Sequence, residues 1–497
     1  LCSLEGMSLC VHKFQAAVRM AGSDWAGKAR VSYDAMLAAY LLNPNASDYS
    51  LKRLQEEAGT ADPEAGKRNR LAGGGAATGE KIGRRPACWP TASRSCWRRW
   101  RFLWLRCWPA WRISAFLVDG ESIRVYGERL ETEIEALQKQ IYEEVGYEFN
   151  INSPKQLGDA LFVKLGLPSG KKTKTGYSTN AEILEKLRYD HPAVELVLHY
   201  RTLTKLKSTY CEGMLKVIGP DGRIHSNFNQ TETRTGRISS TEPNLQNIPV
   251  RTELGRELRK FFLAKEGWVL VDADYSQIEL RVLAHIAHDE NMIKAFQDKE
   301  DIHTITASQV FGMTPGDGDA LMRSRAKAVN FGIVYGIGAF SLSKDINVSR
   351  KEAQRYIDDY LTLYSGVDRY MKEVVEKAKE DGYVETLFHR RRYLPELTAS
   401  NFNLRAFGER VARNMPIQGT AADIIKLAMV RVYRRLKAEG LRARLILQVH
   451  DELDFSVPEG EIEELSAIVK DVMEHIVDLR VPLDVDVSYA DNWAEAH

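Results

Sequence analysis

The sequence has few cysteines, no long apolar run and, in one segment, almost no acidic residues. Its 497 residues include six cysteines, none in a C-x-x-C spacing, and only Cys211 lies beyond residue 107. This distribution supports neither a disulfide framework nor a zinc site, and it fits a reducing, cytoplasmic setting. No stretch reaches the roughly eighteen consecutive apolar residues typical of a transmembrane helix, so we expect none.

The amino end lacks an initiator methionine and a basic region. Its first residues, Leu1–Glu5, therefore do not predict a signal peptide, and we interpret the chain as a fragment. A chain of 497 residues exceeds the usual size of one domain, so we expect roughly two to four domains. A hydrophobic fraction of 44% and a charged fraction of 28% are typical of soluble globular proteins.

The segment 66–115 contains a single acidic residue, Glu80, among many basic residues and tryptophans. Its twelve lysines and arginines give it a charge of +11, which leaves −10 for the remainder of a chain with a formal net charge of +1. Arginine with tryptophan suits a nucleic-acid or membrane surface. The scarcity of acids and the abrupt return to ordinary composition at Phe116 favour the alternative, a stretch translated in a shifted frame. We therefore assign it no function.

A strand-to-helix junction with two aspartates is the first candidate site. Trp268–Val271 is an apolar run typical of a buried strand, and Asp272 and Asp274 follow at period two, on one side of it. Ser276 and Glu279 have the spacing of a capping box before an apolar helix. A carboxylate at the end of a strand suits a metal ligand, but a merely polar strand end explains these residues equally well.

A cationic and aromatic stripe is the second candidate. Four residues recur every four positions and therefore share one side of a helix: Arg323, Lys327, Phe331 and Tyr335. The two cations could hold a triphosphate, and the two aromatic rings could stack on a base. For a helix considered alone, the favoured interpretation is an ordinary amphipathic helix with both rings in the core.

An acidic turn is the third candidate. Apolar residues on both flanks of the segment Leu445–Val457 predict two strands of a hairpin, with His450, Asp451 and Glu452 at the turn. A solvent-exposed acidic turn is a credible alternative for Glu452.

Taken together, the three candidates supply what nucleotidyl transfer needs. Carboxylates bind two Mg²⁺ ions that stabilise the attacking and leaving oxygens, and cations neutralise the triphosphate.

Two polar loops could also contact nucleic acid. Residues 231–251 are too polar for a core and lack a clear helical or strand pattern, which is typical of functional or disordered segments. Their amides, hydroxyls and guanidinium groups suit contacts with phosphates and base edges. The basic loop at 170–179 could contact phosphates, and a solvated surface loop is equally consistent with its composition.

These motifs resemble those of the bacterial family A DNA polymerases. Asp274–Arg281 is similar to the family's first palm motif, Arg323–Gly336 to its fingers helix, and Gln448–Leu453 to its last palm motif. The likeness runs from about Phe116 to Trp493 and includes Thr235–Ser240, Asn244–Arg251 and Pro416–Asp423.

The resemblance implies a multi-domain α/β fold of the right-hand polymerase type. Such a fold has an antiparallel palm sheet, helical fingers and a helical thumb, here preceded by a partial 3′–5′ exonuclease-like region. The implied boundaries are 1–65 for the exonuclease-like region, 66–115 for the anomalous segment, 116–218 for the thumb, 219–279 and 405–497 for the palm, and 280–404 for the fingers.

The resemblance also implies roles for individual residues. Asp274, Asp451 and the Tyr275 carbonyl would hold two Mg²⁺ ions, with Glu452 nearby. Glu279 would crowd the ribose 2′ position and so exclude ribonucleotides. The incoming nucleotide would meet Arg323, Lys327, Phe331, Tyr335, His303 and Gln277, and the primer–template would meet Arg237, Arg251, Arg410, Asn414, Gln418 and His450.

The sequence departs from the family pattern at its amino end. The Asp-x-Glu motif of the exonuclease occurs only as Asp62-Pro-Glu64, out of context, and the later tyrosine–aspartate motif is missing, so we expect no proofreading. The 5′-nuclease domain is absent as well. Asp272 is a further departure, because a small or apolar residue is more usual there.

The sequence thus predicts a monomeric DNA-directed DNA polymerase of replication and repair, located in the cytoplasm and associated with the bacterial nucleoid. Its partners would be primer–template DNA and dNTPs, with no membrane. Two alternatives stay open, a single-subunit RNA polymerase of the same fold and a non-catalytic DNA-binding remnant. Glu279 argues against the first, and the second requires a failure to fold.

Overall fold

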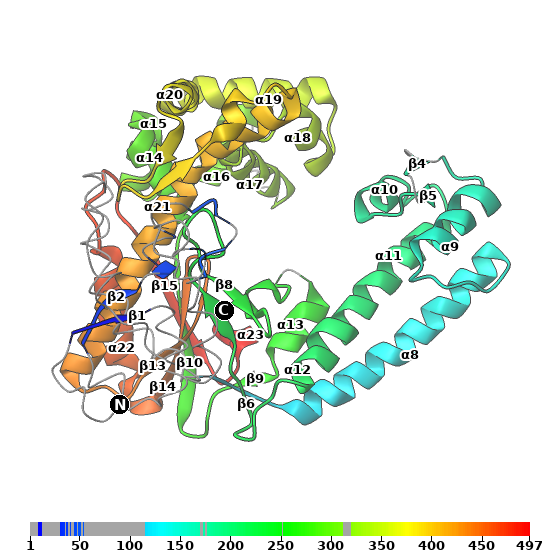
Figure 1. Ribbon diagram of the computed structural model, residues 1–497, viewed down its shortest axis with the longest axis horizontal. Coiled ribbons are helices and arrows are strands. Elements are labelled where there is room, and N and C mark those ends of the chain that lie inside the picture. Colours follow the sequence, from blue (N-terminus) through cyan, green and yellow to red (C-terminus); the bar gives the residue numbers. More distant parts are fainter. Residues whose placement is uncertain are drawn as a thin grey trace, which may run out of the picture. The chain divides into compact units, whose positions relative to one another are not determined.

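The computed structural model describes residues 8–11, 30–34, 36–37, 40, 44–46, 48–50, 53, 115–168, 172–173, 176–250, 252–311 and 320–497 (Figure 1). Arg251, Asp62-Pro-Glu64, residues 170–171 and 174–175 of the basic loop, and the arginine- and tryptophan-rich segment up to residue 114 therefore lie outside it. The chain forms two compact units. The larger comprises Leu1–Ser114, Asn227–Thr241 and Gly267–Tyr489, and the smaller comprises Ala115–Ser226, Glu242–Glu266 and Ala490–His497.

The larger unit is built on a four-stranded sheet in the order β13-β14-β10-β15. The central strand pair is antiparallel, with Val271 opposite Phe455 and Asp274 opposite Glu452. Burial of apolar side chains stabilises the sheet, and Val271, Phe455 and Val457 are fully buried. The strands span Trp268–Tyr275 (β10), Arg444–Val449 (β13), Glu452–Pro458 (β14) and Val485–Ala490 (β15).

Helices pack on this sheet and against one another. Helix α22 (Ile462–Glu474) contacts β10 and β14, and it also packs on the long helix α21 (Phe402–Glu439). Figure 1 shows α21, coloured orange, running past the sheet toward the yellow and green helices of the same unit. Asn401 caps α21 by accepting hydrogen bonds from the amides of Asn403 and Leu404, and Gly440 ends the helix in the left-handed conformation.

A group of shorter helices surrounds the amino-terminal half of α21. They contact one another in sequence, and α14, α17 and α20 each contact α21. A two-stranded sheet and a 3-10 turn complete this group. The elements are α14 (Ile278–Ala287), α15 (Glu290–Gln297), α16 (Ile302–Phe311), α17 (Ala320–Val334), α18 (Ala339–Asp345), α19 (Arg350–Leu363), α20 (Ser365–Asp381), β11 (Tyr383–Glu385), β12 (Arg391–Tyr393) and η4 (Pro395–Thr398).

Short strands complete the larger unit. Strands β7 (Asn227–Asn229) and β8 (Ser239–Thr241) form an antiparallel pair joined by residues 230–238. The prediction that residues 231–251 are irregular is wrong at β8 and at the 3-10 turn η3 (Leu245–Asn247). Near the amino end, β1 (Ser8–Val11) and β2 (Arg30–Asp34) form a parallel pair. The 3-10 turn η5 (Glu459–Glu461) joins β14 to α22.

The smaller unit is mainly helical. Helix α8 (Gly120–Val145) confirms the helix predicted over residues 121–146, and it packs along α11 (Pro192–Lys205), which lies beside it in Figure 1. Its other helical elements are α9 (Pro154–Gly158), η1 (Asp159–Lys164), α10 (Ala181–Lys186), η2 (Leu206–Glu212), α12 (Gly213–Leu215), η3 (Leu245–Asn247), α13 (Glu253–Arg259) and α23 (Trp493–Ala496).

An aromatic cluster anchors the strands of the smaller unit. The rings of Phe116, Phe262 and Trp493 lie 5.3–5.5 Å apart, and the guanidinium of Arg259 lies over the Trp493 ring at 4.0 Å. The strands are β3 (Phe116–Val118), β6 (Arg223–Ile224) and β9 (Phe262–Leu263), with the separate pair β4 (Lys172–Thr173) and β5 (Gly176–Tyr177). Among the described helices, none is long and apolar enough to cross a membrane.

Candidate functional site

Four carboxylates meet where β10 and β14 run side by side. The antiparallel register sets Asp272 opposite Asp454 and Asp274 opposite Glu452. A carboxylate oxygen of Asp272 lies within 4.8 Å of one of Glu452. Asp272, Glu452 and Asp454 are buried, so the alternative of a solvent-exposed Glu452 is wrong. Period-two alternation and cross-strand pairing together gather acids that are far apart in the sequence.

A fourth aspartate of the site, Asp451, lies on the turn between β13 and β14. The turn consists of His450 and Asp451, and His450 adopts a left-handed conformation with φ of 51°. The Gln448 side-chain amide donates to the His450 carbonyl at 2.7 Å. The Tyr275 amide donates to the Asp451 carbonyl at 3.3 Å, so the turn is joined to the end of β10. The predicted hairpin is confirmed, although Glu452 belongs to its second strand.

Burial and neighbouring acids raise the pKa of the Asp451 carboxyl. Burial, followed by the negative charge of Glu279, raises the pKa of its carboxyl to about 6, while Arg237 acts in the opposite direction. Asp272 contributes in the same sense as Glu279. Carboxylates that raise one another's pKa form an electronegative site, which a cation would stabilise.

Glu279 does not cap the helix that follows. Helix α14 begins at Ile278 after Gln277, which has a left-handed backbone with φ of 53° and makes no side-chain cap. The predicted capping box of Ser276 and Glu279 is therefore wrong. The Glu279 carboxylate instead accepts one bond from the Arg237 guanidinium at 2.5 Å and another from the Tyr335 hydroxyl at 2.9 Å. Arg237 and Tyr335 each bind one oxygen of this buried carboxylate, so tertiary partners hold Glu279 in place of the local cap.

The cationic stripe of α17 lies next to α16. Arg323 pairs with Asp301 at 2.7 Å, and its side chain is 56% exposed. Phe331 is half-buried, its ring 5.8 Å from that of His303, and Tyr335 follows the end of α17 with its side chain 44% exposed. The expectation that both aromatic rings lie in the core is therefore wrong. Lys327 is exposed on the same face.

His303 is buried beneath this stripe. Its Nδ1 lies 2.7 Å from the Asn330 side-chain nitrogen, and the Asn330 oxygen accepts a bond from Thr306 at 3.0 Å. Burial, reinforced by the positive charges of Arg323 and Lys327, lowers the pKa of His303 to about 4, against the opposing effect of Asp301. The ring is therefore neutral at physiological pH.

The described residues predicted to meet the primer–template lie on three elements. Arg410, Asn414 and Gln418 lie on α21, Arg237 on the β7–β8 loop and His450 on the β13–β14 turn. Arg410, Asn414 and Gln418 lie four residues apart, so they share a face of α21. Arg410 is exposed, and its side chain lies against Gly336, directly after Tyr335. This contact joins the stripe of α17 to the polar face of α21.

Asp301, Asn330 and Asp454 were not predicted as parts of the site. Asp301 and Asn330 hold Arg323 and His303, and Asp454 faces Asp272 across the sheet. Only the register of the hairpin against β10 reveals the position of Asp454. From the sequence alone, the period-two spacing of Asp272 and Asp274 identifies the polar face of β10, but it does not show which residue of the partner strand lies opposite.

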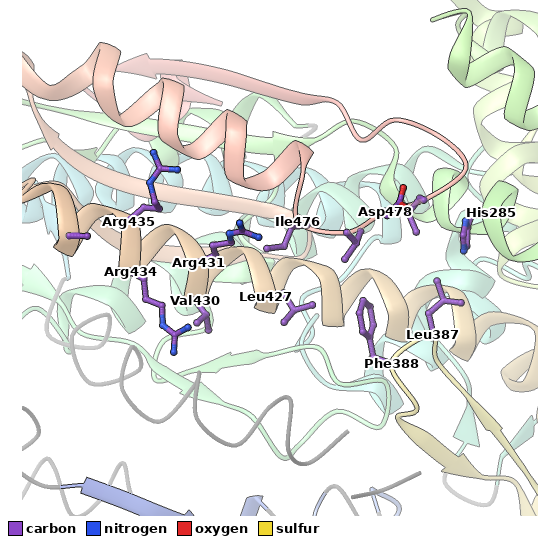
Figure 2. Close-up of a pocket in the computed structure, with 13 residues that line it drawn as sticks. His285, Leu387, Phe388, Leu427, Val430, Arg431, Arg434, Arg435, Ile476 and Asp478 are labelled. Carbon is purple, nitrogen blue, oxygen red and sulfur yellow. The ribbon is translucent and has the colours of Figure 1, made fainter. Parts of the chain in front are cut away.

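A separate groove of about 930 Å³ lies on the carboxyl-terminal half of α21 (Figure 2). Its lining combines apolar side chains of α21 and of the segment after α22 with Arg431, Arg434 and Arg435. Arg435 is bound by Glu439 and Asp471 at its rim. No residue predicted for the site lines this groove, so it is distinct from the carboxylate cluster.

Comparison with known proteins places these features in one family. Residues 121–495 match the family model described as DNA polymerase family A. The chain is 56% identical over 381 residues to DNA polymerase I of Geobacillus stearothermophilus and 54% identical over 381 residues to that of Bacillus subtilis. These matches cover 76% of the chain but only 44% and 43% of the two relatives, so the chain spans less than half of their length.

A solved structure extends the likeness to three dimensions. The chain is similar to the POL domain of Pol1 from M. smegmatis, solved in complex with DNA primer-template and dNTP. The two share 39% sequence identity with a TM-score of 0.89, and the match covers 99% of this chain and 86% of that one. The expected fold, with an antiparallel sheet and helical surroundings in a multi-domain α/β chain, is confirmed.

Proposed function

The chain belongs to DNA polymerase family A, and from this membership and the geometry of the site we propose that it is a DNA-directed DNA polymerase. It would extend a primer on a DNA template with dNTPs, in replication and repair in the bacterial cytoplasm, and act as a monomer. The observation that carries the proposal is the junction between β10 and the β13–β14 turn, where the Tyr275 amide binds the Asp451 carbonyl beside Asp274.

The carboxylates at this junction fit divalent metal ions. All the side-chain donors are hard oxygens, as Mg²⁺ prefers. The pKa of Asp451 is raised first by burial and then by the charge of Glu279, and a bound cation would offset both effects. Asp274 and Asp451 would hold two Mg²⁺ ions with the Tyr275 carbonyl, and Glu452 would support them from β14. When bound, the ions would supply charge stabilisation for the attacking and leaving oxygens.

The exposed cations of α17 would bind the triphosphate of the incoming nucleotide. Arg323 and Lys327 lie on one exposed face, and Arg323 is held by Asp301 at 2.7 Å. Triphosphate binding would exchange that carboxylate for phosphate oxygens, which carry more charge and can bind the guanidinium at two points. Neutral His303, beneath the stripe, would add a hydrogen bond without adding charge, and Gln277 would lie beside the nucleotide.

The aromatic residues and Glu279 would define the pocket for the nucleoside. Phe331 and Tyr335 would pack on the incoming base and the templating position. The Glu279 carboxylate, fixed by Arg237 and Tyr335, would occupy the space that a ribose 2′-hydroxyl requires. This arrangement favours deoxyribonucleotides through steric exclusion rather than through attraction.

The polar face of α21 and the neighbouring loops would contact the primer–template near its end. Arg237, Arg410, Asn414, Gln418 and His450 would donate to minor-groove acceptors, and Arg251 would join them. Those acceptors are nearly independent of sequence, so the contacts would check the geometry of a base pair without reading it.

Primer extension tests the proposal directly. The purified chain should extend a labelled primer with Mg²⁺ and dNTPs, and Asp451→Ala should reduce extension by at least roughly a thousandfold while DNA binding persists, because one of the two principal metal ligands is lost. Asp478→Ala removes an exposed carboxylate in the groove of Figure 2 and serves as the matched control.

Three outcomes would contradict the assignment. Undiminished extension by the Asp451→Ala variant would refute the metal ligand. A preference for NTPs over dNTPs would identify an RNA polymerase instead. DNA binding by a folded parent chain that cannot extend a primer would identify a non-catalytic remnant.

A further inference from the structure

The loop that carries Arg237 is clamped at several points. We call residues 233–237, between β7 and β8, the Arg237 loop. The Tyr40 hydroxyl donates to the Thr233 carbonyl at 2.7 Å, and the Thr233 hydroxyl donates to the Arg237 carbonyl at 2.6 Å. These bonds close the loop on itself and attach its first residue to a side chain distant in the sequence.

A buried ion pair lies against the middle of the Arg237 loop. Arg390 donates to one oxygen of Asp423 at 2.9 and 2.7 Å, and the Thr386 hydroxyl donates to the other oxygen at 2.9 Å. Arg390 is 5% exposed and Asp423 is fully buried. A Cβ at Gly236, where φ is 91°, would lie 2.6 Å from Arg390 Nε, so only glycine lets the loop lie this close to the guanidinium.

Helix α21 supplies two further contacts with the same loop. Lys426, which is buried, donates from Nζ to the Gly236 carbonyl. A Cβ at Gly419 would lie 3.1 Å from the Thr235 carbonyl oxygen, so the helix backbone approaches the loop closely there. Gly419, Asp423 and Lys426 are spaced four and three residues apart and therefore form one face of α21.

The clamped loop ends at the residue that holds Glu279. Arg237 donates to Glu279 Oε1 at 2.5 Å, and Tyr335 donates to Oε2 at 2.9 Å. The position of the Glu279 carboxylate therefore depends on Arg237, and the position of Arg237 depends on the contacts made by Lys426 and Arg390. Arg390, Asp423 and Lys426 are buried and hydrogen-bonded, which limits their movement and makes the support of the Arg237 loop stiff.

We propose that Lys426 and the Arg390–Asp423 pair are positioning residues for sugar discrimination, acting through the Arg237 loop on Glu279. The proposal rests on the proposed polymerase function and on the sugar gate at Glu279. None of the three residues was among the predicted site residues. They would not touch the nucleotide, but they would determine how precisely the Glu279 carboxylate excludes a 2′-hydroxyl.

The Lys426→Met variant tests the proposal, because it removes the donor to Gly236 and keeps the length of the side chain. We expect its preference for dATP over ATP, measured as the ratio of kcat/KM values, to fall about tenfold, as for loss of a hydrogen bond from a charged group. The matched control is Lys437→Met, an exposed lysine on the same helix, which should keep the parental ratio. A parental ratio in Lys426→Met would overturn the proposal.

A double-mutant cycle separates positioning from general destabilisation. If Lys426 acts through Glu279, then Lys426→Met should change the ratio in the parent and leave it unchanged in a Glu279→Ala background. Independent, multiplicative effects would refute the connection. Lys426→Arg, which keeps a donor, should restore most of the parental preference, and assays run well below the unfolding temperature of each variant exclude losses caused by unfolding.

Failure of the Lys426 proposal can be distinguished from failure of the polymerase function and of the Glu279 gate. A parent chain that cannot extend a primer refutes the polymerase function before any variant is compared. A parental ratio in Glu279→Ala refutes the gate. If Lys426→Met does not fold, Gly236→Ala replaces it, since its Cβ would displace the loop from Arg390 and should lower the ratio in the same direction.

Discussion

Glu279 joins three elements of the larger unit through its two carboxylate oxygens. It lies on α14, its first partner, Arg237, lies on the β7–β8 loop, and its second, Tyr335, follows α17. The two bonds hold the Glu279 carboxylate in one position. A fixed carboxylate is what steric exclusion of a ribose 2′-hydroxyl requires. The same contacts raise the pKa of the Tyr335 hydroxyl, through burial and the Glu279 charge, so that it remains a donor.

Removal of the Glu279 carboxylate should therefore relax the choice of sugar. We expect Glu279→Ala to increase ATP incorporation relative to dATP by about a hundredfold, as for the loss of a steric and electrostatic barrier of roughly 3 kcal/mol. Steady-state kinetics with both nucleotides on one template measure the ratio. Glu290→Ala, at the start of the next helix, is the control, and an unchanged ratio in Glu279→Ala would exclude the gate.

His303 should make the free energy of unfolding decrease as the pH falls below about 6.5. Its pKa is about 4 in the folded chain and about 6.5 in the unfolded chain, so the unfolded state binds more protons between these values. The folded state is therefore favoured above pH 6.5 and loses stability as pH falls toward 4. The expected loss between pH 7.5 and pH 5 is about 2 kcal/mol from this residue.

A His303→Asn variant checks this expectation. Asparagine cannot take up the proton, so the decrease in unfolding temperature between pH 7.5 and pH 5 should be smaller in the variant than in the parent. His475→Asn is the control, because His475 is exposed at the carboxyl end of α22. Equal decreases in parent and variant would show that His303 is not the titrating group.

At the scale of secondary-structure elements, the turn after α17 meets the amino-terminal part of α21 at Gly336. This glycine has φ of 69°, and a Cβ there would lie 3.1 Å from the Arg410 Cγ. A left-handed backbone lets the chain turn from α17 into α18 and leaves room for Arg410. The nucleotide-facing and DNA-facing residues of the proposed site are thus joined by one backbone turn.

Gly336→Ala should disturb both properties of this turn. We expect about 1 kcal/mol of lost stability from the left-handed conformation, and a higher KM for dNTP because Tyr335 and Arg410 shift. Thermal unfolding and single-nucleotide insertion measure the two effects. Gly338→Ala is the control, because a Cβ at Gly338 meets nothing within 4 Å and its backbone is extended. Equal unfolding temperatures and equal KM values for dNTP in the two variants would show that the turn at Gly336 has neither effect.

At the scale of the whole molecule, the chain spans less than half of the DNA polymerase I relatives that it matches. The family match begins at residue 121, after the arginine- and tryptophan-rich segment. The larger unit contains every described residue that was predicted for the site. Substitutions at the predicted site residues therefore test polymerase chemistry without changing any residue that precedes the family match.

The sequence predicts that this chain does not proofread. With Mg²⁺ and no dNTPs, a primer with a mismatched 3′ end should stay at its original length, because the exonuclease metal motifs are missing from the sequence. Gel analysis over a time course longer than that of extension measures this. Shortening of the primer that persists in the Asp451→Ala variant would show an independent nuclease and contradict the prediction.

The sequence by itself determined the elements and their chemical character. A short apolar run predicted β10, apolar flanks around a polar turn predicted the β13–β14 hairpin, and helical periodicity predicted α8. The carboxylates, the cationic stripe and the family motifs are likewise readable from residue order. The capping box at Ser276 failed because a local hydrogen bond competes with tertiary partners that the sequence does not show.

Only the tertiary structure decided which residues meet. The pairing of Asp272 with Asp454, of Glu279 with Arg237, and of Arg390 with Asp423 joins residues separated by 33 to 182 positions. Such contacts depend on strand register and on the direction in which helices leave the sheet, and a shift of one residue would reverse every side chain of a strand. Residue types therefore specified the chemistry, and packing specified its geometry.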